Sequence, residues 1–415
     1  MLNQESSLSY KNINFWQWIE NHLHDDPSRL RLAGFSDENI DASDAITQIE
    51  CRRRFGKKLG ETLQEFGQFY FPSKLAGEQS TSDRLARWHT GYVSIDDTMV
   101  DLTAGLGIDV MHLARKVRHA TAVERNPTLA AAMEYNAEGL KVGDKLSVMC
   151  GDCTKLIDKL KGTVAFIDPA RRADDGSRVY GFSDCEPDVK TLIPKISENF
   201  DRLIIKASPM LDITEIIKEL YDISDIYVVG TTTECKEIDV ILNFRVSVAS
   251  VPKIHAVTLF SQSYSTGDAA DVFEFTQNME NEATAIVSKA MPHAGDKLFV
   301  PYPATMKAAP VKLLSAQFGI NKFHDNTHLY FGTKAVDNFP GETLNIIDVI
   351  PWQSKNIKRL KSQYPNASVS VRNFGMTADA LSKKLGIREG GTRRLRLFGI
   401  GLGNSHTDRI LVITE

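Results

Sequence analysis

From Thr98 onward, short apolar runs alternate with stretches of helical periodicity, and this alternation constrains the fold more than any other feature of the chain. The runs are TMVDL, HATAVE, KLSVM, TVAFID, RLIIKA and IYVVG. Apolar runs of this length separated by helices indicate parallel strands joined by crossover helices. We therefore predict a doubly wound α/β core over residues 94–250.

The interval after the sixth run sets the last strand of this core apart. Only TTTECKE lies between IYVVG and IDVILNFRV, which is too short for a crossover helix. The last strand should therefore return antiparallel as a hairpin. An antiparallel seventh strand distinguishes methyltransferase cores from dehydrogenase cores, so the pattern favours a Rossmann-like, seven-stranded methyltransferase core.

The regions on either side of the core have a different texture. A chain of 415 residues exceeds what one hydrophobic core usually organises. Phe15, Trp18, Ile19 and Leu23 recur at three- and four-residue steps, which predicts a helical region over residues 1–93. Strand-like and helical segments also alternate after the core, and they predict two small α+β modules over residues 251–345 and 346–415.

Composition and charge limit the classes of partner that we expect for this protein. Hydrophobic content of 42% and charged content of 25% are typical of a soluble globular protein, and no apolar run approaches the ~20 residues of a membrane span. The start lacks a secretion signal and the five cysteines form no pairing framework, so we expect a cytoplasmic protein. The net charge is −4, yet residues 355–415 hold twelve basic and four acidic side chains. This basic end favours a polyanionic partner.

A glycine-rich segment, Asp101 to Gly107 (DLTAGLG), joins the first predicted strand to a helix. Glycines allow a tight turn and close approach to a ligand, while the helix N-terminus offers free N–H groups. A dinucleotide fingerprint would place a third glycine at position 110, which is Val110. The segment is either a nucleoside-cofactor loop or an ordinary turn between strand and helix.

Two acidic residues follow the next strands. Glu124 closes the second strand, 17 residues after Gly107, where a carboxylate can accept both ribose hydroxyls. Asp152 follows the third strand, where it could accept the amino hydrogens of adenine. The adjacent Cys150 and Cys153 could form a redox pair or half of a zinc site, but we favour coincidence because no further ligands are suitably spaced. We predict no metal site.

The fourth strand ends in Asp168-Pro169-Ala170-Arg171-Arg172, at the edge where open α/β sheets collect their ligands. In this order, DLTAGLG, Glu124, GDC and IDPARR resemble the motifs of class I S-adenosylmethionine-dependent methyltransferases. More narrowly, EQSTSDRLARWHTG, IDPARR and KKLGIREGGTRRL resemble bacterial class I methyltransferases with a THUMP-like C-terminal domain. The resemblance implies that the module over residues 251–345 is ferredoxin-like and that over residues 346–415 is THUMP-like.

The same resemblance implies roles for residues around the core. The cofactor would be S-adenosyl-L-methionine, bound near Asp101, Thr103, Gly105, Gly107, Glu124, Arg125, Asp152, Cys153 and Asp168. The catalytic candidates are Asp168, Pro169 and Arg171. The segment before the first strand supplies Ser82, Asp83, Arg84 and Trp88, either as a lid over the cofactor or as a helix packed on the sheet.

The fourth-strand motif departs from that of base-amino methyltransferases, which carry Asn/Asp/Ser-Pro-Pro and an aromatic residue. Only Asp168 and Pro169 remain, and Arg171 offers a guanidinium plane in place of the ring. Asp168 could be a general base or an orienting acceptor. Methylation at pyrimidine C5 would need a nucleophilic cysteine, for which Cys185 and Cys235 are candidates by default.

The predicted partner is RNA, either tRNA or rRNA. Phosphate contacts are expected from basic residues at the rim of the core and in the C-terminal module: Arg171, Arg172, Lys206, Lys383, Lys384, Arg393, Arg394 and Arg396. The alternatives are a methyltransferase of protein or small molecules, and a catalytically silent RNA-binding factor that retains the cofactor pocket. A nicotinamide-dependent oxidoreductase is disfavoured by Val110 and by the terminal hairpin.

Overall fold

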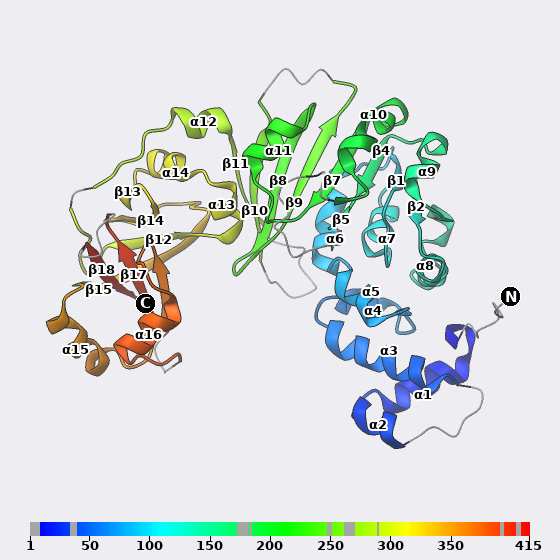
Figure 1. The fold of residues 1–415 in the computed structure, drawn as a ribbon, viewed down its shortest axis with the longest axis horizontal. Helices are drawn as coiled ribbons and strands as arrows, with labels where there is room; N and C mark the ends of the chain where they lie inside the picture. The colour runs from blue at the N-terminus through cyan, green and yellow to red at the C-terminus, as the bar shows by residue number, and fades with distance from the viewer. Residues whose placement is uncertain are drawn as a thin grey trace. The chain divides into compact units, whose positions relative to one another are not determined.

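The computed structural model describes residues 9–33, 40–171, 182, 185–246, 251–260, 270–288, 290–390, 394–403 and 408–415 (Figure 1). The chain divides into two compact units. The first comprises Met1–Ala207, Lys218–Asp222 and Val240–Ser247, and the second comprises Ser208–Ile217, Ile223–Asp239 and Val248–Glu415. In the ranges described, none of the helices combines the length and the apolar character needed to cross a membrane.

The first unit begins with helices, as the periodicity predicts. They are η1 (Ser9–Lys11), α1 (Ile13–His22), α2 (Pro27–Ala33), α3 (Ala42–Phe55), α4 (Gly60–Glu65), α5 (Lys74–Gln79), α6 (Asp83–His89) and η2 (Thr90–Tyr92). Phe15, Trp16 and Ile19 of α1 pack against Ile49 of α3 in a buried cluster. Apolar residues at such spacing form one helix face, and that face becomes the core.

Parallel strands follow these helices. The strands are β1 (Thr98–Asp101), β2 (His119–Glu124), β3 (Leu146–Cys150), β4 (Val164–Ile167) and β7 (Arg202–Ala207), and β1 pairs with both β2 and β4. The intervening helices are α7 (Ile108–Ala114), α8 (Pro127–Gly139), η3 (Gly143–Lys145), α9 (Cys153–Leu156), η4 (Ile157–Lys159) and α10 (Val189–Asn199). A short ribbon of β5 (Ala170–Arg171) and β6 (Cys185–Glu186) lies between β4 and α10 in the sequence. The predicted parallel core is confirmed.

The predicted hairpin is also present. It consists of β8 (Ile223–Thr231), which follows α11 (Ile213–Glu219), and β9 (Cys235–Asn243). The Thr231 N–H donates to the Glu234 carbonyl at 2.8 Å, and the Asn243 N–H donates to the Asp222 carbonyl at 2.9 Å. These two bonds close opposite ends of one antiparallel pair. The strand order in this part of the sheet is β3-β2-β1-β4-β7-β9-β8.

The sheet continues beyond the seven strands that the sequence predicts. β10 (Lys253–Leu259) pairs parallel to β8, and β11 (Ala270–Thr276) pairs antiparallel to β10. Among the described residues the sheet therefore has nine strands. The first strands after residue 250 extend the large sheet, whereas we expected them in a separate small module.

The rest of the second unit forms another sheet, in the order β13-β14-β12-β15-β18-β17-β16. Its strands are β12 (Lys297–Pro301), β13 (Asn321–His324), β14 (Thr327–Gly332), β15 (Gly341–Pro351), β16 (Ser368–Arg372), β17 (Arg396–Gly401) and β18 (Arg409–Thr414). The helices of this part are α12 (Gln277–Glu282), α13 (Pro303–Ala308), α14 (Val311–Phe318), α15 (Ser354–Gln363) and α16 (Ala378–Leu385). β15 pairs with β12 through its first half and with β18 through its second half.

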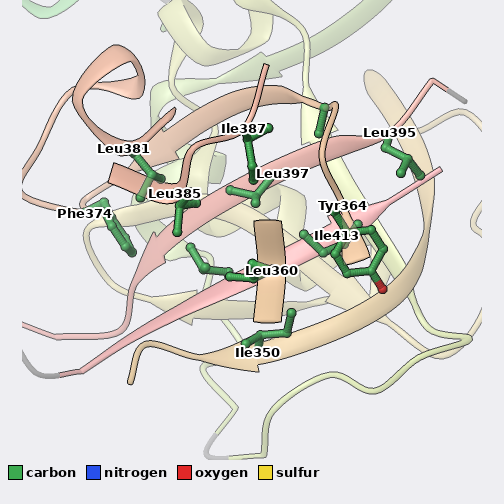
Figure 2. Packing of buried hydrophobic residues seen from close by; sticks show 12 residues of the cluster. Ile350, Leu360, Tyr364, Phe374, Leu381, Leu385, Ile387, Leu395, Leu397 and Ile413 are labelled. Atoms are coloured by element: carbon green, nitrogen blue, oxygen red, sulfur yellow. The ribbon is translucent and has the colours of Figure 1, made fainter. Parts of the chain in front are cut away.

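Apolar residues on the two faces of this sheet build two cores. Leu360 of α15 and Leu381 and Leu385 of α16 pack with Leu397 and Ile413 of the strands (Figure 2). The alternate strand positions, such as Phe398, Ile400 and Val412, join a second cluster with residues of β12, β13 and β14. The period of two in a strand explains why neighbours such as 397 and 398 enter different cores.

Candidate active site

Acidic and basic side chains gather at the carboxyl ends of the parallel strands. Asp101 and Glu124 close β1 and β2, and Asp168 directly follows β4. In the register, Asp101 pairs with Phe166 and Ile167 pairs with Ile205, so Asp168 and Lys206 follow paired residues. The structure thus brings these predicted residues to the same edge of the sheet, where ligands bind in open α/β folds.

Hydrogen bonds tie the glycine-rich loop to three strands. The Thr103 N–H donates to the Asp101 carboxylate at 3.0 Å, and the Thr103 hydroxyl accepts the Asp168 N–H at 2.8 Å. The Gly105 N–H donates to Glu124 at 2.8 Å. The loop is therefore held in place by the ends of β1, β2 and β4.

The two glycines of this loop serve different purposes. Both have positive φ angles, 57° at Gly105 and 85° at Gly107. A Cβ at Gly107 would lie 2.6 Å from Cγ of Met133, whereas a Cβ at Gly105 would meet no atom within 4 Å. Gly107 is thus required for packing against α8, and Gly105 leaves open space beside its backbone.

Glu124 is buried, and its carboxylate organises the turn after β2. One oxygen accepts the Gly105 N–H and the other accepts the Asn126 N–H at 2.7 Å. Asn126 in turn caps α8 by accepting the Thr128 N–H at 2.9 Å. Because an ionised carboxylate has about four lone-pair sites, Glu124 keeps capacity for ligand hydroxyls. The neighbouring Arg125 is exposed and pairs with Glu186 at 2.5 Å.

Asp101 and Asp152 differ sharply in environment. Asp101 is 2% exposed, and burial raises the pKa of its carboxyl well above the usual range. Asp101 therefore stabilises the glycine-rich loop from the buried side, through its bond to the Thr103 N–H. Asp152 is partly exposed and caps α9, and the Thr154 hydroxyl at 2.7 Å lowers the pKa of its carboxyl. The adjoining Cys153 is buried, which raises the pKa of its thiol to about 11.

Lys206 lies inside an ionic network. Its ammonium is 2.6 Å from the Asp168 carboxylate and 3.5 Å from that of Asp109, and it donates to the Thr81 hydroxyl at 2.7 Å. The side chain of Lys206 is 11% exposed, whereas that of Asp168 is 41% exposed. We expected Lys206 to contact substrate phosphate, but the structure pairs it with two carboxylates.

Three members of this network were missed by sequence reasoning: Thr81, His89 and Asp109. The ring of His89 is fully buried, and its Nδ1 lies 2.8 Å from the Asp109 carboxylate. Burial would raise the pKa of Asp109, but Lys206 and His89 outweigh it and hold that pKa well below the usual range. Asp109 is thus a buried carboxylate held between two basic side chains.

The segment before β1 is a packed helix. α6 is capped by Ser82, whose hydroxyl accepts the Leu85 N–H at 3.4 Å, and it contacts α7. Asp83 is buried and accepts the N–H groups of Glu61 and Thr62 at 2.9 and 3.1 Å. Of the two alternatives for this segment, these contacts fit the packing helix.

The remaining predicted residues are dispersed. The backbone of Arg171 pairs with Cys185, Pro169 is partly exposed, and Arg172 and Arg393 lie outside the described residues. Lys383 and Arg394 are exposed, and the ammonium of Lys384 lies 5.1 Å from the ring centroid of Trp352. Arg396 forms a two-bonded ion pair with Glu342, one bond being 3.1 Å.

The fold and the strand-end site define a Rossmann-like methyltransferase fold with additional C-terminal α+β domains. Family models match residues 298–340 as a ferredoxin-like domain and residues 341–415 as THUMP domain-like. A crystal structure from Porphyromonas gingivalis W83, provisionally described as a methyltransferase, is 27% identical with a TM-score of 0.84 over 97% of both chains. The chain therefore fits the family of methyltransferases with a THUMP-like domain, as the sequence resemblance predicts.

Two other solved structures are more distant. An RNA methyltransferase from Salinibacter ruber in complex with S-adenosyl-L-homocysteine is 17% identical, covering 42% of this chain and 96% of its own, with a TM-score of 0.30. The tRNA m1G37 methyltransferase of M. jannaschii is 16% identical, covering 40% and 50%, with a TM-score of 0.28. Both matches cover less than half of this chain.

Proposed function

We propose that this protein is an S-adenosylmethionine-dependent methyltransferase that acts on RNA, either tRNA or rRNA, and that its C-terminal modules bind the RNA. The observation that carries the proposal is the convergence of the Gly105 loop, Glu124 and Asp168 at one edge of the parallel sheet. Of the domain boundaries expected from the sequence, we keep residues 1–93 and 94–250 as a proposal, with β10 and β11 added to the core sheet. For the C-terminal modules we propose a boundary at residue 341 in place of 346.

The residues at this edge fit a nucleoside cofactor. Glu124 keeps lone pairs for ribose hydroxyls, Asp152 offers a partly exposed carboxylate to an adenine amino group, and Gly105 leaves open space beside its backbone. Asp101 and Thr103 stabilise the glycine-rich loop through the bond between them. S-adenosylmethionine would supply a methyl group already activated by its sulfonium.

Asp168 is proposed to orient the acceptor, together with Pro169 and Arg171. Its carboxylate already accepts from the Lys206 ammonium at 2.6 Å, and this ion pair stabilises the charged form. A carboxylate in such an ion pair remains a hydrogen-bond acceptor. It therefore suits holding an N–H or O–H of the substrate in line with the methyl group, and this positioning supplies much of the rate.

RNA as the substrate is supported by two features of the second unit. The match to a THUMP domain-like model covers residues 341–415, and residues 355–415 carry the excess of basic side chains. Lys383 and Arg394 are exposed and are proposed to contact phosphate. Arg396 is bound to Glu342 and is proposed to act mainly in holding the sheet.

The first test is cofactor binding by calorimetry. We expect micromolar binding of S-adenosylmethionine to the native protein and at least about tenfold weaker binding to Glu124→Ala, because one lost charged hydrogen bond is worth about 1.5–3 kcal/mol. Glu134→Ala is the matched control, since this exposed glutamate lies on α8. Absence of binding by folded native protein would contradict the proposal.

The second test is transfer of a radiolabelled methyl group to total RNA. Label that disappears with RNase treatment supports the RNA methyltransferase. Label that remains in protein or small molecules supports the alternative substrates. Cofactor and RNA binding without any product, at saturating cofactor, supports the silent RNA-binding factor.

A further inference from the structure

Three basic side chains lie at one corner of the seven-stranded sheet: Lys322 on β13, His328 on β14 and Arg372 on β16. Lys322 pairs across the β13–β14 hairpin with Tyr330, and His328 precedes Tyr330 by two residues. Since alternate residues of a strand share a face, Lys322 and His328 are diagonal neighbours on one side of the hairpin. The Lys322 ammonium reaches the hairpin turn, where it donates to the Asp325 carbonyl at 2.9 Å.

Arg372 reaches this corner because the sheet curves back on itself. β14 and β16 contact each other although they are not neighbours in the strand order. Arg372 pairs with Ile400, and the next residue, Gly401, accepts the Thr327 hydroxyl through its carbonyl at 2.8 Å. Thr327 precedes His328. The end of β16 therefore lies close to the start of β14.

Among the described residues, the positive charges of this corner have no ion-pair partner. Lys322 is 2% exposed, and Arg372 donates to the carbonyl of Val371 at 2.9 Å. Over the described ranges, no carboxylate lies within the 4.0 Å of an ion pair with either side chain. His328 is partly buried, and its Nδ1 is buried without a hydrogen-bond partner among the described residues.

The energetics of this arrangement are unfavourable without an anion. Burial lowers the pKa of Lys322, although the carboxylates of Asp325 and Glu280 act in the opposite direction. Burial alone lowers the pKa of Arg372. Burial, and then the charges of Lys322 and Arg372, lower the pKa of His328. Removing a charge from water costs free energy unless the charge is paired. A bound oxyanion would compensate these charges, because hydrogen bonds from charged donors to an anion are the strong ones.

We propose that Lys322, His328 and Arg372 form an oxyanion site that holds one backbone phosphate of the bound RNA. The inference of an oxyanion site depends only on these three residues. The assignment of the oxyanion to RNA rests on the RNA-binding part of the proposed function. The site lies where the segment matched as ferredoxin-like meets the segment matched as THUMP domain-like. It includes none of the basic residues of α16 or of the stretch before β17.

Thermal unfolding of the full chain tests the oxyanion site, with inorganic phosphate as the probe. At matched ionic strength, about 50 mM phosphate in place of chloride should raise the native midpoint by about 2–4 °C. Arg372→Met and Lys322→Met should each abolish this rise. Arg359→Met, which removes an exposed guanidinium from α15, should keep it. An equal rise in native protein and both cluster variants, or no rise at all, overturns the site.

The same variants show that a lost response is not a folding defect. In chloride alone, Arg372→Met should unfold at the native temperature or above it, because methionine replaces an uncompensated buried cation. A fall of several degrees in chloride for both cluster variants would show that the cations hold the fold together, and it would overturn the inference.

RNA binding then tests the assignment to a backbone phosphate. In fluorescence anisotropy with unfractionated tRNA and no cofactor, Arg372→Met should weaken binding about tenfold at low salt and reduce the slope of log affinity against log salt by about one. Arg359→Met reports the effect of losing one surface charge. A phosphate response with unchanged RNA affinity would overturn the RNA assignment and leave a site for free phosphate. Because no cofactor is present, the result is independent of methyl transfer.

Discussion

The ammonium of Lys206 bridges two carboxylates, at 2.6 Å from Asp168 and 3.5 Å from Asp109. Asp168 is partly exposed at the candidate active site, whereas Asp109 is buried and also bound to His89. One cation therefore links the surface of the site to its interior. The position of Asp168 therefore depends on residues that are largely buried.

Lys206→Met should destabilise the protein by about 3 kcal/mol at neutral pH, because it leaves the Asp109 carboxylate buried with one of its two basic partners. Urea unfolding at pH 7 measures this change. Lys195→Met is the control, since Lys195 pairs with Asp158 on the surface and should cost less than about 1 kcal/mol. Equal urea midpoints for Lys206→Met and native protein would show that the network contributes nothing to stability.

The pH dependence of stability should change with the same substitution. The pKa of Asp109 is lower in the folded than in the unfolded state, so its contribution is present above about pH 4 and is lost as the pH falls further. In Lys206→Met the folded-state pKa rises toward the unfolded one. The loss of stability between about pH 4 and 2 should therefore be shallower than in native protein. An unchanged slope, measured by urea unfolding, would argue against the pairing.

Asp152→Asn should weaken S-adenosylmethionine binding about tenfold while leaving α9 intact, because asparagine caps a helix as well as aspartate does. Asp188→Asn is the matched control: Asp188 caps α10 in the same way, accepting the Lys190 N–H at 3.0 Å. Calorimetry compares the two. Equal affinities for both variants would assign Asp152 to helix capping alone.

Alanine substitutions at the two loop glycines should separate packing from ligand space. Gly107→Ala meets Met133 at 2.6 Å and should cost about 2–3 kcal/mol of stability. Gly105→Ala should cost about 1 kcal/mol, from its positive φ alone, yet should weaken cofactor binding at least about tenfold. Urea unfolding and calorimetry give both quantities. A Gly105→Ala protein with native affinity would exclude the cofactor from this side of the loop.

Thiol reactivity should follow burial. Burial raises the pKa of both Cys153 and Cys235 to about 11, whereas Cys150 is exposed. At pH 8 we expect iodoacetamide to modify Cys150 first, with Cys153 and Cys235 reacting after denaturation, as read by mass spectrometry. The reactivity of Cys235 should keep rising up to about pH 11. Rapid labelling of Cys235 in native protein would support the hypothesis that Cys235 is a catalytic nucleophile.

The strand ends of the site could be predicted because each acidic residue directly follows an apolar run. Glu124 and Asp168 are such residues, and the short interval before IDVILNFRV predicted the hairpin. The order of apolar runs along the chain therefore predicts both the parallel core and the sheet edge at which ligands bind. Local signals of this kind are readable without knowledge of long-range contacts.

The ionic network could not be predicted in the same way. Thr81, Asp109 and Lys206 come from distant parts of the chain and meet only in the folded state. Nothing near Asp109 in the sequence marks it as buried. The ion pair of Arg396, which we predicted to contact phosphate, was not foreseen either, because its partner Glu342 lies 54 residues away in the sequence. Charged residues show their type in the sequence but not their partner.

β15 carries the boundary between the two matched C-terminal segments. The ferredoxin-like match ends at residue 340, and the THUMP domain-like match starts at Gly341, the first residue of β15. The first half of that strand pairs with β12, and the second half pairs with β18. Neither segment can rotate relative to the other unless backbone hydrogen bonds of β15 are broken. The two segments should therefore move as one rigid body, and the RNA that we propose as their partner would meet both at a fixed separation.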